Sequence, residues 1–149
     1  MNSSSLPNLP CMCSSFRRTS RALTQLYEEA LQPLGLRVTQ FTILQALTLA
    51  GEVTQGQLGE ILAMDSTTLT RTLTMMSGKG WIAERRGKDR RQRWLSLAKA
   101  GKAQLSSALP LWEKVQSRLR RQVGDQVWQN LFQLNRQLTG IAITQGDSL

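Results

Sequence analysis

The first third of the chain carries apolar residues at helical spacing. Between residues 14 and 34 they stand three, four or seven positions apart, which is the pattern of an amphipathic helix. Pro33 and Gly35 are typical of the end of such a helix. A second helix is predicted to begin at a Thr39 cap and to end at Gly51. This part of the chain is therefore expected to be helical.

The following segment predicts two short helices joined by a tight turn. One is expected over residues 55–63 after a Thr54 cap. The other is expected over residues 66–77 after an Asp65 cap. The apolar positions predicted to be buried in the first are Leu58, Ile61 and Leu62. The second has an inward face spaced i, i+4 and i+7, formed by Leu69, Leu73 and Met76. Both helices are thus expected to pack one side on a core.

The outward face of residues 66–77 is polar and carries a positive charge. At about 100° per residue, it consists of Thr67, Arg71, Thr74 and Gly78, with Thr68 and Thr70 beside it. A face of threonine and arginine, without bulky apolar residues, suits insertion into a DNA groove. It suits a merely solvated surface equally well, so the pattern by itself leaves both interpretations open.

After Gly80 the spacing changes from helical to strand-like. Residues 81–85 and 93–97 are predicted to be strands, the second because its apolar residues alternate with polar ones. The connecting loop, residues 86–92, has the strongly basic sequence RGKDRRQ. A hairpin with a basic tip can lie along a DNA backbone or place an arginine in a narrow minor groove.

The remainder of the chain predicts two long helices with heptad-like apolar stripes. The stripes are Leu105, Ala108, Trp112, Val115 and Leu119, and then Val127, Leu131, Leu134, Leu138 and Ile141. Pro110 is expected to kink the first helix or to stand where its partner bond is already lost. Gly124 and an Asp125 cap separate it from the second. These stripes favour a partner subunit over an intramolecular helical layer, because they exceed what the middle of the chain can cover.

Positive charge is concentrated rather than spread. The formal net charge is +9, and fourteen of the nineteen basic residues but only three of the ten acids lie between residues 66 and 121. A basic surface of this kind binds nucleic acid or an anionic membrane. No apolar run approaches the roughly 18 to 20 residues of a membrane span, and residues 1–10 do not resemble a signal peptide. Double-stranded DNA is the favoured partner, with no membrane partner and a cytoplasmic location expected.

The sequence lacks the residue combinations that usually build catalytic and metal sites. The chain has no histidine, which removes the commonest general base and the commonest metal ligand. Cys11 and Cys13, the only cysteines, complete neither a zinc site nor a disulfide framework. Paired acids and a phosphate-binding loop are also lacking. We therefore expect no enzyme activity, no cofactor and no metal.

Three segments resemble the MarR family of regulators. Residues 58–73, LGEILAMDSTTLTRTL, resemble the family's helix-turn-helix, and residues 78–82, GKGWI, resemble the passage into its wing. Residues 89–97, DRRQRWLSL, resemble its wing motif, an Asp-x-Arg followed six residues on by Leu-Thr. The resemblance spans roughly residues 14 to 144. It implies a mainly α (α+β) fold, in which a winged helix-turn-helix lobe is joined to N- and C-terminal helices that form a dimerisation layer.

The resemblance further implies a transcription regulator that binds a palindromic operator in double-stranded DNA as a homodimer. It divides the chain into a flexible arm (1–13), a dimerisation region (14–37 and 99–149) and a DNA-binding lobe (38–98). The DNA-contacting residues that it implies are Ser66, Thr67, Thr68, Thr70, Arg71, Thr74, Lys88, Asp89, Arg90 and Arg91. Asp89 either holds a neighbouring arginine by a charge-assisted bond or is a plain turn former.

The chain departs from the family pattern at three positions. Ala98 stands where a helix-capping threonine is usual, at a cost of about 1 kcal/mol of capping energy. Ala63 stands where a turn glycine is common, and Ser66 stands where many relatives carry a bulkier or basic residue.

The resemblance implies a repressor that is released by a small ligand or by cysteine oxidation. A small aromatic or anionic effector is one candidate partner. Cys11 and Cys13 are candidate redox sensors; a disulfide within one chain is strained at this spacing, and one between two subunits is easier. The alternative is that both are small buried hydrophobic residues. A different function also stays open, a winged-helix adaptor that binds protein or RNA without tight operator recognition.

Overall fold

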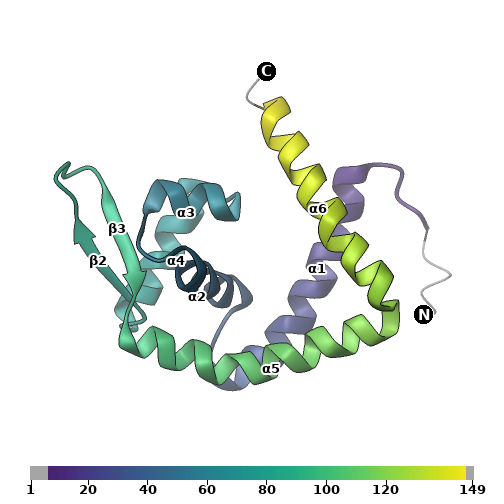
Figure 1. The fold of residues 1–149 in the computed structure, drawn as a ribbon, viewed down its shortest axis with the longest axis horizontal. Helices are drawn as coiled ribbons and strands as arrows, with labels where there is room; N and C mark the ends of the chain where they lie inside the picture. Colours follow the sequence, from purple (N-terminus) through teal and green to yellow (C-terminus); the bar gives the residue numbers. More distant parts are fainter. Residues whose placement is uncertain (1–6, 147–149) are drawn as a thin grey trace. The chain divides into compact units, whose positions relative to one another are not determined.

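The computed structural model describes residues 7–146, which fall into two compact units with the boundary between Trp112 and Glu113 (Figure 1). The first unit contains α1 (Met12–Leu31), the 3-10 helix η2 (Gln32–Leu34), α2 (Val38–Ala50), β1 (Val53–Thr54), α3 (Gln55–Leu62), α4 (Ser66–Gly78), β2 (Ile82–Arg86), β3 (Arg93–Leu97) and the first part of α5 (Lys99–Val123). The second contains the rest of α5 and α6 (Asp125–Gly146). The predicted mainly α fold with a small sheet is confirmed. No helix within residues 7–146 is long and apolar enough to cross a membrane.

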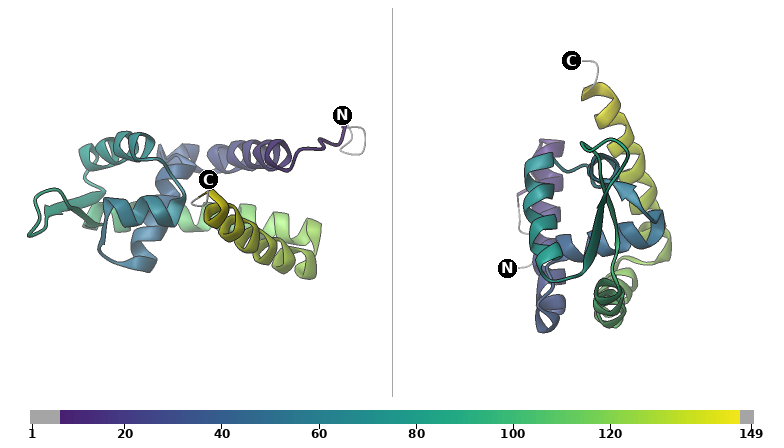
Figure 2. Two further views of the ribbon diagram at one scale, coloured as in Figure 1. Left: turned by 90° about the horizontal axis from the view of Figure 1, so that it is seen from above. Right: turned by 90° about the vertical axis from the view of Figure 1, so that its left-hand side faces the viewer.

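The three strands form one antiparallel sheet in the order β1-β3-β2. The hairpin pairs Ile82 with Leu97 and Arg86 with Arg93, and Val53 of β1 pairs with Leu95 on the other side of β3. Both hairpin strands were predicted to within one residue. β1 was not predicted, because a strand of two residues is too short to show alternation. In Figures 1 and 2 the hairpin projects from the helices of its unit and its tip stands apart from them.

The core of the first unit is built mainly from α2 and α4. Side chains from α2 that are buried in it include Phe41, Ile43, Leu44 and Leu47. The predicted inward face of α4 is confirmed, since Leu69, Leu73 and Met76 are at most 1% exposed. Burial of each such side chain contributes about 1.5–3 kcal/mol. The core therefore fixes which face of α4 points outward.

The predicted burial of α3 was only partly right. Leu58 is fully buried and Leu62 is half-buried, but Ile61 is 54% exposed. α3 has only eight residues. A helix this short that rests on the core along the line of Leu58 and Leu62 leaves Ile61 beside that line.

Helix caps were predicted correctly where a side chain reaches its own helix. Thr54 accepts a hydrogen bond from the Gln57 N–H at 3.2 Å, and Asp65 accepts one from the Thr68 N–H at 2.9 Å. The Thr39 cap was wrong, because α2 already begins at Val38 and Thr39 is exposed in its first turn. The N–H of Val38 is instead accepted by Glu28 of α1 at 3.0 Å, and Gln40 of α2 itself accepts the N–H of Arg37 at 2.9 Å.

The break between α5 and α6 lies at Gly124, which adopts a left-handed conformation with φ of 85°. Asp125 was predicted as the cap of α6 but is its first helical residue. The Gly124 carbonyl accepts the Trp128 N–H, and the Asp125 carboxylate accepts the Nε–H of Arg120 at 2.7 Å. Pro110 lies inside α5, which continues through it despite the missing N–H.

Two small residues decide how α5 starts. Ala98 occupies the position before the helix, where it offers no side-chain acceptor, and its own N–H donates to the Trp81 carbonyl at 3.0 Å. A Cβ on Gly101 would lie 2.1 Å from that same carbonyl. Glycine at position 101 therefore allows α5 to approach β2 closely.

Ala63, between α3 and α4, carries the least favourable backbone geometry of the described chain. Its φ of 50° and ψ of 42° are left-handed, and it is the only non-glycine residue within 7–146 with positive φ. The turn geometry explains why a glycine is common here, since a left-handed conformation costs a residue with a Cβ about 1–2 kcal/mol.

Replacing this residue relieves the strain. We expect Ala63→Gly to raise the free energy of unfolding by about 1 kcal/mol, measured by urea denaturation. The matched control is Ala103→Gly at an exposed position inside α5, which should lower it by about 0.5–1 kcal/mol. Destabilisation by both changes would contradict the assignment of strain to Ala63.

The Asp65 cap predicts a pH dependence. The backbone N–H and then the hydroxyl of Thr68 lower the pKa of Asp65. Its stabilising effect is therefore complete above the ordinary Asp pKa and is lost as the pH falls through the lowered value in the folded state. Asp65→Asn keeps an acceptor that does not titrate.

The stability difference between the wild-type chain and Asp65→Asn should thus shift against the wild type between neutral pH and about pH 3. Urea denaturation at a series of pH values measures it. Parallel stability profiles for the two proteins would show that the carboxylate does not act as a charged cap.

Candidate nucleic-acid interface

The exposed face of α4 presents short polar side chains and one arginine. Ser66, Thr67, Thr68, Thr70, Arg71 and Thr74 are all exposed, as expected from the pattern. Arg71 forms no ion pair among the described residues. Because Leu69 and Leu73 anchor the opposite face, these side chains cannot turn inward without unpacking the core. α4 is therefore a rigid helix whose solvent side has hydrogen-bonding groups and a positive charge.

The threonine hydroxyls of this face differ in their existing partners. The Thr74 hydroxyl donates to the Thr70 carbonyl at 2.9 Å, inside the helix. Thr70 Oγ1 accepts a hydrogen bond from Gln55 Nε2 of α3 at 2.8 Å. The hydroxyl of Thr67 has no hydrogen-bond partner within residues 7–146. Thr67 and Arg71 are thus available to an external ligand, as is the Ser66 hydroxyl, which also forms no hydrogen bond within the described chain.

The tip of the hairpin is a compact turn of exposed residues. The Gln92 N–H donates to the Asp89 carbonyl at 3.0 Å, and the Asp89 carboxylate accepts the backbone N–H of Arg91 at 3.0 Å. Asp89 is therefore a turn former. Its carboxylate forms no ion pair with an arginine side chain within the described chain. The side chains of Lys88, Arg90 and Arg91 are exposed, without an acidic partner in the described range.

Two other arginines of the hairpin are engaged with acids. Arg85 forms a two-pronged ion pair with Glu52, with Nε 2.8 Å from Oε2, and lies over the Trp94 ring. That ion pair raises the pKa of Arg85 and lowers the pKa of Glu52. Arg93 pairs with Glu84 across the sheet. The sequence places all these arginines in one basic stretch, but the structure separates structural cations from free ones.

Two further residues belong to this surface and were not predicted. Gln55, at the start of α3, contacts both Thr70 and Arg93, with 3.3 Å between its Oε1 and Arg93 Nη1. Glu84 also accepts the Ser77 hydroxyl of α4 at 2.8 Å. These contacts join residues 7 to 38 positions apart. No local sequence signal identifies them, because they depend on how α3, α4 and the hairpin pack.

Cys11 and Cys13 lie at the start of α1 and are both exposed. Within the single chain they are therefore not the small buried hydrophobic residues of the alternative interpretation. Cys11 stands immediately before the helix. The backbone N–H and hydroxyl of Ser14 stabilise the thiolate and lower the pKa of Cys11.

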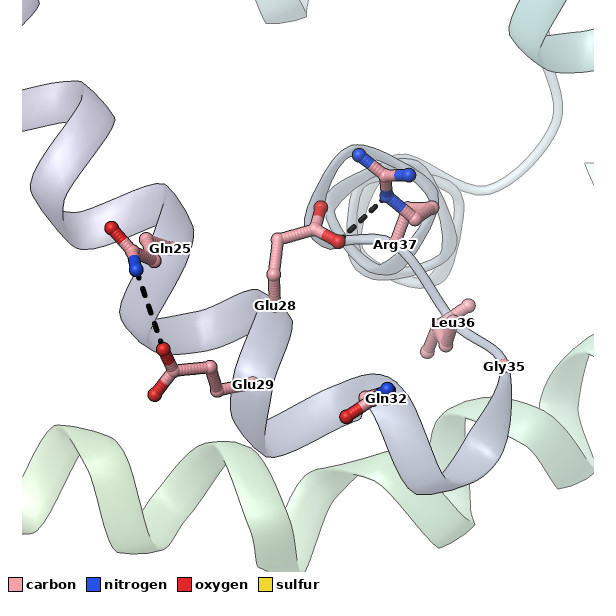
Figure 3. A pocket seen from close by; sticks show the side chains of 7 residues that line it. All are labelled: Gln25, Glu28, Glu29, Gln32, Gly35, Leu36 and Arg37. Atoms are coloured by element: carbon pink, nitrogen blue, oxygen red, sulfur yellow. Dashed lines mark hydrogen bonds and ion pairs between the residues drawn. The ribbon is translucent and has the colours of Figure 1, made fainter.

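One pocket of the first unit has a volume of about 650 Å³ and lies where α1, η2 and the start of α2 meet. Figure 3 shows that Glu28 and Glu29 line it together with Arg37. Arg37 is already paired with Glu28 at 2.6 Å. Two carboxylates and one neutralised guanidinium disfavour an anionic ligand at this place.

A second pocket suits an anion better. It has a volume of about 490 Å³ and lies between α2, the end of β3 and α5. Leu47, Leu97 and Leu105 contribute apolar walls, and Lys102 contributes an ammonium group that forms no ion pair within the described chain. Glu52 also lines this pocket, but its carboxylate is paired with Arg85, so Lys102 is the charged side chain of the lining that stays free. Apolar walls with one free cation suit a small aromatic anion.

Comparisons with known proteins agree on one family. The profile of the MarR family matches residues 34–92. An uncharacterised HTH-type transcriptional regulator of Bacillus subtilis is 30% identical over 82 residues, which cover 55% of this chain and 60% of that protein. The multiple antibiotic resistance protein MarR of Salmonella typhimurium is 38% identical over 58 residues, 39% of this chain and 40% of that protein. The chain thus spans 40 to 60% of these two relatives.

Solved structures extend the similarity to most of the chain. The Mycobacterium tuberculosis transcriptional regulator MosR, solved in complex with DNA, is 34% identical and superimposes with a TM-score of 0.76, covering 87% of this chain and 97% of that one. A cysteine-to-serine mutant of Escherichia coli MarR, solved with operator DNA, shares the fold with a TM-score of 0.77 at 22% identity over 85% of this chain and 92% of that one. This chain belongs to the MarR family of winged helix-turn-helix transcriptional regulators.

Proposed function

We propose that this protein is a sequence-specific regulator that binds a palindromic operator in double-stranded DNA as a homodimer. One observation carries the proposal: the threonine and arginine face of α4 and the unpaired cations of the hairpin tip belong to one compact unit. A groove-sized helix with Arg71 outward suits direct readout of base edges. Arg90 and Arg91, on a projecting turn, suit a minor groove or the phosphate backbone.

The homodimer is supported by apolar surface that no described residue covers. Phe16 and Leu23 of α1 are 41% and 38% exposed. The exposed large apolar residues of α6 are Val127, Leu131, Phe132, Leu134, Leu138, Ile141 and Ile143. Such faces in a regulator fit a second copy of the chain, because a two-fold protein matches a palindromic site. We accordingly assign residues 14–37 and 99–149 to dimerisation, 38–98 to the DNA-binding lobe and 1–13 to an arm. Residues 1–6 and 147–149 lie outside the described residues, and α1 already begins at Met12.

DNA is favoured over the alternative, an adaptor for protein or RNA. Both MosR and Escherichia coli MarR have been solved with DNA. The free cations here stand on a helix and a hairpin tip, which are the two elements that a winged helix places in adjacent grooves. An adaptor requires neither this pairing nor two-fold symmetry.

We infer that the regulator is a repressor released by oxidation of its cysteines. The exposure of Cys11 and its lowered pKa give the thiolate access to a peroxide. The thiolate attacks one peroxide oxygen, the O–O bond breaks and water leaves after protonation, so that Cys11 becomes a sulfenic acid. A second thiol then condenses with it, releasing another water and forming a disulfide. A disulfide between subunits avoids the strain of a bridge from Cys11 to Cys13.

Removal of single arginines tests the DNA interface. Arg71→Ala and Arg91→Ala should each weaken binding to an operator selected from random duplexes by about 1–3 kcal/mol, if they contact base edges. Affinity should also fall steeply with salt, because neutralised phosphates release counterions. Fluorescence anisotropy at two salt concentrations measures both effects, and a footprint of two-fold symmetry identifies the dimer.

The matched control is Arg118→Ala, which removes an exposed arginine of α5 outside the proposed interface. It should leave operator affinity within about twofold. Unchanged binding by both Arg71→Ala and Arg91→Ala would refute this interface, and weak, asymmetric binding of the wild-type protein to every duplex would favour the adaptor.

Oxidation tests the signal. Hydrogen peroxide should reduce operator affinity of the wild-type protein by at least about tenfold, and a thiol reductant should restore it. A covalent dimer on a non-reducing gel would identify the disulfide between subunits. Cys11→Ser should bind the operator normally and no longer respond. If oxidised wild-type protein keeps its affinity, the signal is instead a small aromatic anion, for which the pocket beside Lys102 is the better place.

A further inference from the structure

Five polar side chains form a closed circuit that begins and ends on α4. Gln55 donates to Thr70 at 2.8 Å and accepts from Arg93 at 3.3 Å. Arg93 pairs with Glu84, and Glu84 accepts the Ser77 hydroxyl at 2.8 Å. The circuit therefore runs from α4 to α3, then through β3 and β2, and returns to α4. We call these five residues the polar ring.

The two α4 residues of the polar ring, Thr70 and Ser77, lie on one side of the helix. Thr70 and Ser77 are seven residues apart, which is close to two full turns of a helix, so their side chains point in nearly the same direction. One end fastens α4 to α3, and the other fastens it to the hairpin. A helix held at two points two turns apart resists both rotation and sliding relative to the sheet.

Gln55 is the one neutral link between the charged part of the ring and the helix. The guanidinium of Arg93 can only donate hydrogen bonds, so the amide oxygen of Gln55 has to face it. The amide nitrogen is then directed to Thr70, where the hydroxyl oxygen accepts. The chemistry of its two neighbours thus fixes the orientation of this amide.

The charged half of the ring is partly sheltered from water. The side chains of Arg93 and Glu84 are 32% and 27% exposed. Burial raises the pKa of Glu84, but the hydrogen bonds from Arg93 and Ser77 outweigh it, so the net effect is a lowered pKa. The carboxylate is charged at neutral pH and is satisfied by these two partners.

We propose that the polar ring sets the orientation of the hairpin relative to α4, and that Gln55 and Thr70 are positioning residues for operator recognition rather than base-reading residues. This inference rests on the proposed DNA-binding function. Contacts by α4 and by the hairpin tip have to be made at the same time, so an error in their relative orientation weakens specific binding. Attraction to phosphates tolerates such an error, because it depends on charge and not on register.

Substitutions at Thr70 separate the two roles of its side chain. Thr70→Val keeps the shape and loses the hydroxyl, whereas Thr70→Ser keeps the hydroxyl and loses the methyl group. A positioning role predicts that Thr70→Val lowers affinity for the selected operator roughly 5- to 10-fold, as expected for a lost hydrogen bond. Thr70→Ser should remain within about twofold of the wild type.

Gln55→Met removes the link from the other side at nearly constant size. It should lower operator affinity by a similar factor, and the double variant with Thr70→Val should bind no more weakly than the weaker single variant, because both changes break the same contact. Affinity for random duplex should be unchanged in all three. The matched control is Gln45→Met on α2, where the glutamine is half-buried and forms no hydrogen bond within the described chain. Circular dichroism confirms that each variant is folded.

Each result supports or overturns the inference. Losses that add in the double variant, equal losses on operator and random duplex, or a Thr70→Ser variant as weak as Thr70→Val would overturn it; the last result would make the methyl group a base contact. Full affinity of every variant would overturn the polar ring and leave the DNA-binding function intact. A wild-type protein that binds no duplex would overturn both.

Discussion

The surface that faces a ligand depends on one packing interaction, the burial of the inner side of α4. Leu69, Leu73 and Met76 are almost completely excluded from water. At about 1.5–3 kcal/mol for each such side chain, turning the helix over is prohibitive compared with a total stability of about 5–15 kcal/mol. Because the helical period is 3.6 residues, burial of these three residues places Thr67 and Arg71 on the opposite side. The core therefore decides what the solvent face offers.

Electrostatics complete this division, because two acids pair with particular arginines of the hairpin and leave its other cations free. Glu52 holds Arg85 and Glu84 holds Arg93, and both arginines lie in the hairpin strands close to the turn. Asp89, the acid in the turn itself, accepts a hydrogen bond from the backbone N–H of Arg91. The cations left without an acid, Lys88, Arg90 and Arg91 among them, lie where the hairpin is most exposed. The same basic stretch thus both fastens the hairpin and provides its free positive charge.

Local signals in the sequence predict this architecture well. Apolar periodicity located the helices and the inner side of α4, and short-range hydrogen bonding located the caps at Thr54 and Asp65. The failures have a common cause. The exposure of Ile61, the start of α2 and the role of Gln55 are all decided by how the elements pack on one another, which the local sequence does not show. Candidate contacts on α4 were predictable from its period, whereas their existing hydrogen bonds were not.

The small apolar surface of the hairpin explains why polar contacts hold it in place. Only Ile82 of β2 and Leu95 of β3 are buried, so the hairpin has little apolar surface with which to hold a fixed orientation. Apolar contact is also non-directional and permits sliding, whereas a chain of hydrogen bonds and an ion pair holds defined distances and angles. The hairpin has to contact one groove of the DNA while α4 contacts the next, so a fixed orientation matters more for it than a large buried surface. Partly sheltered polar contacts between the hairpin, α3 and α4 provide it without enlarging the core.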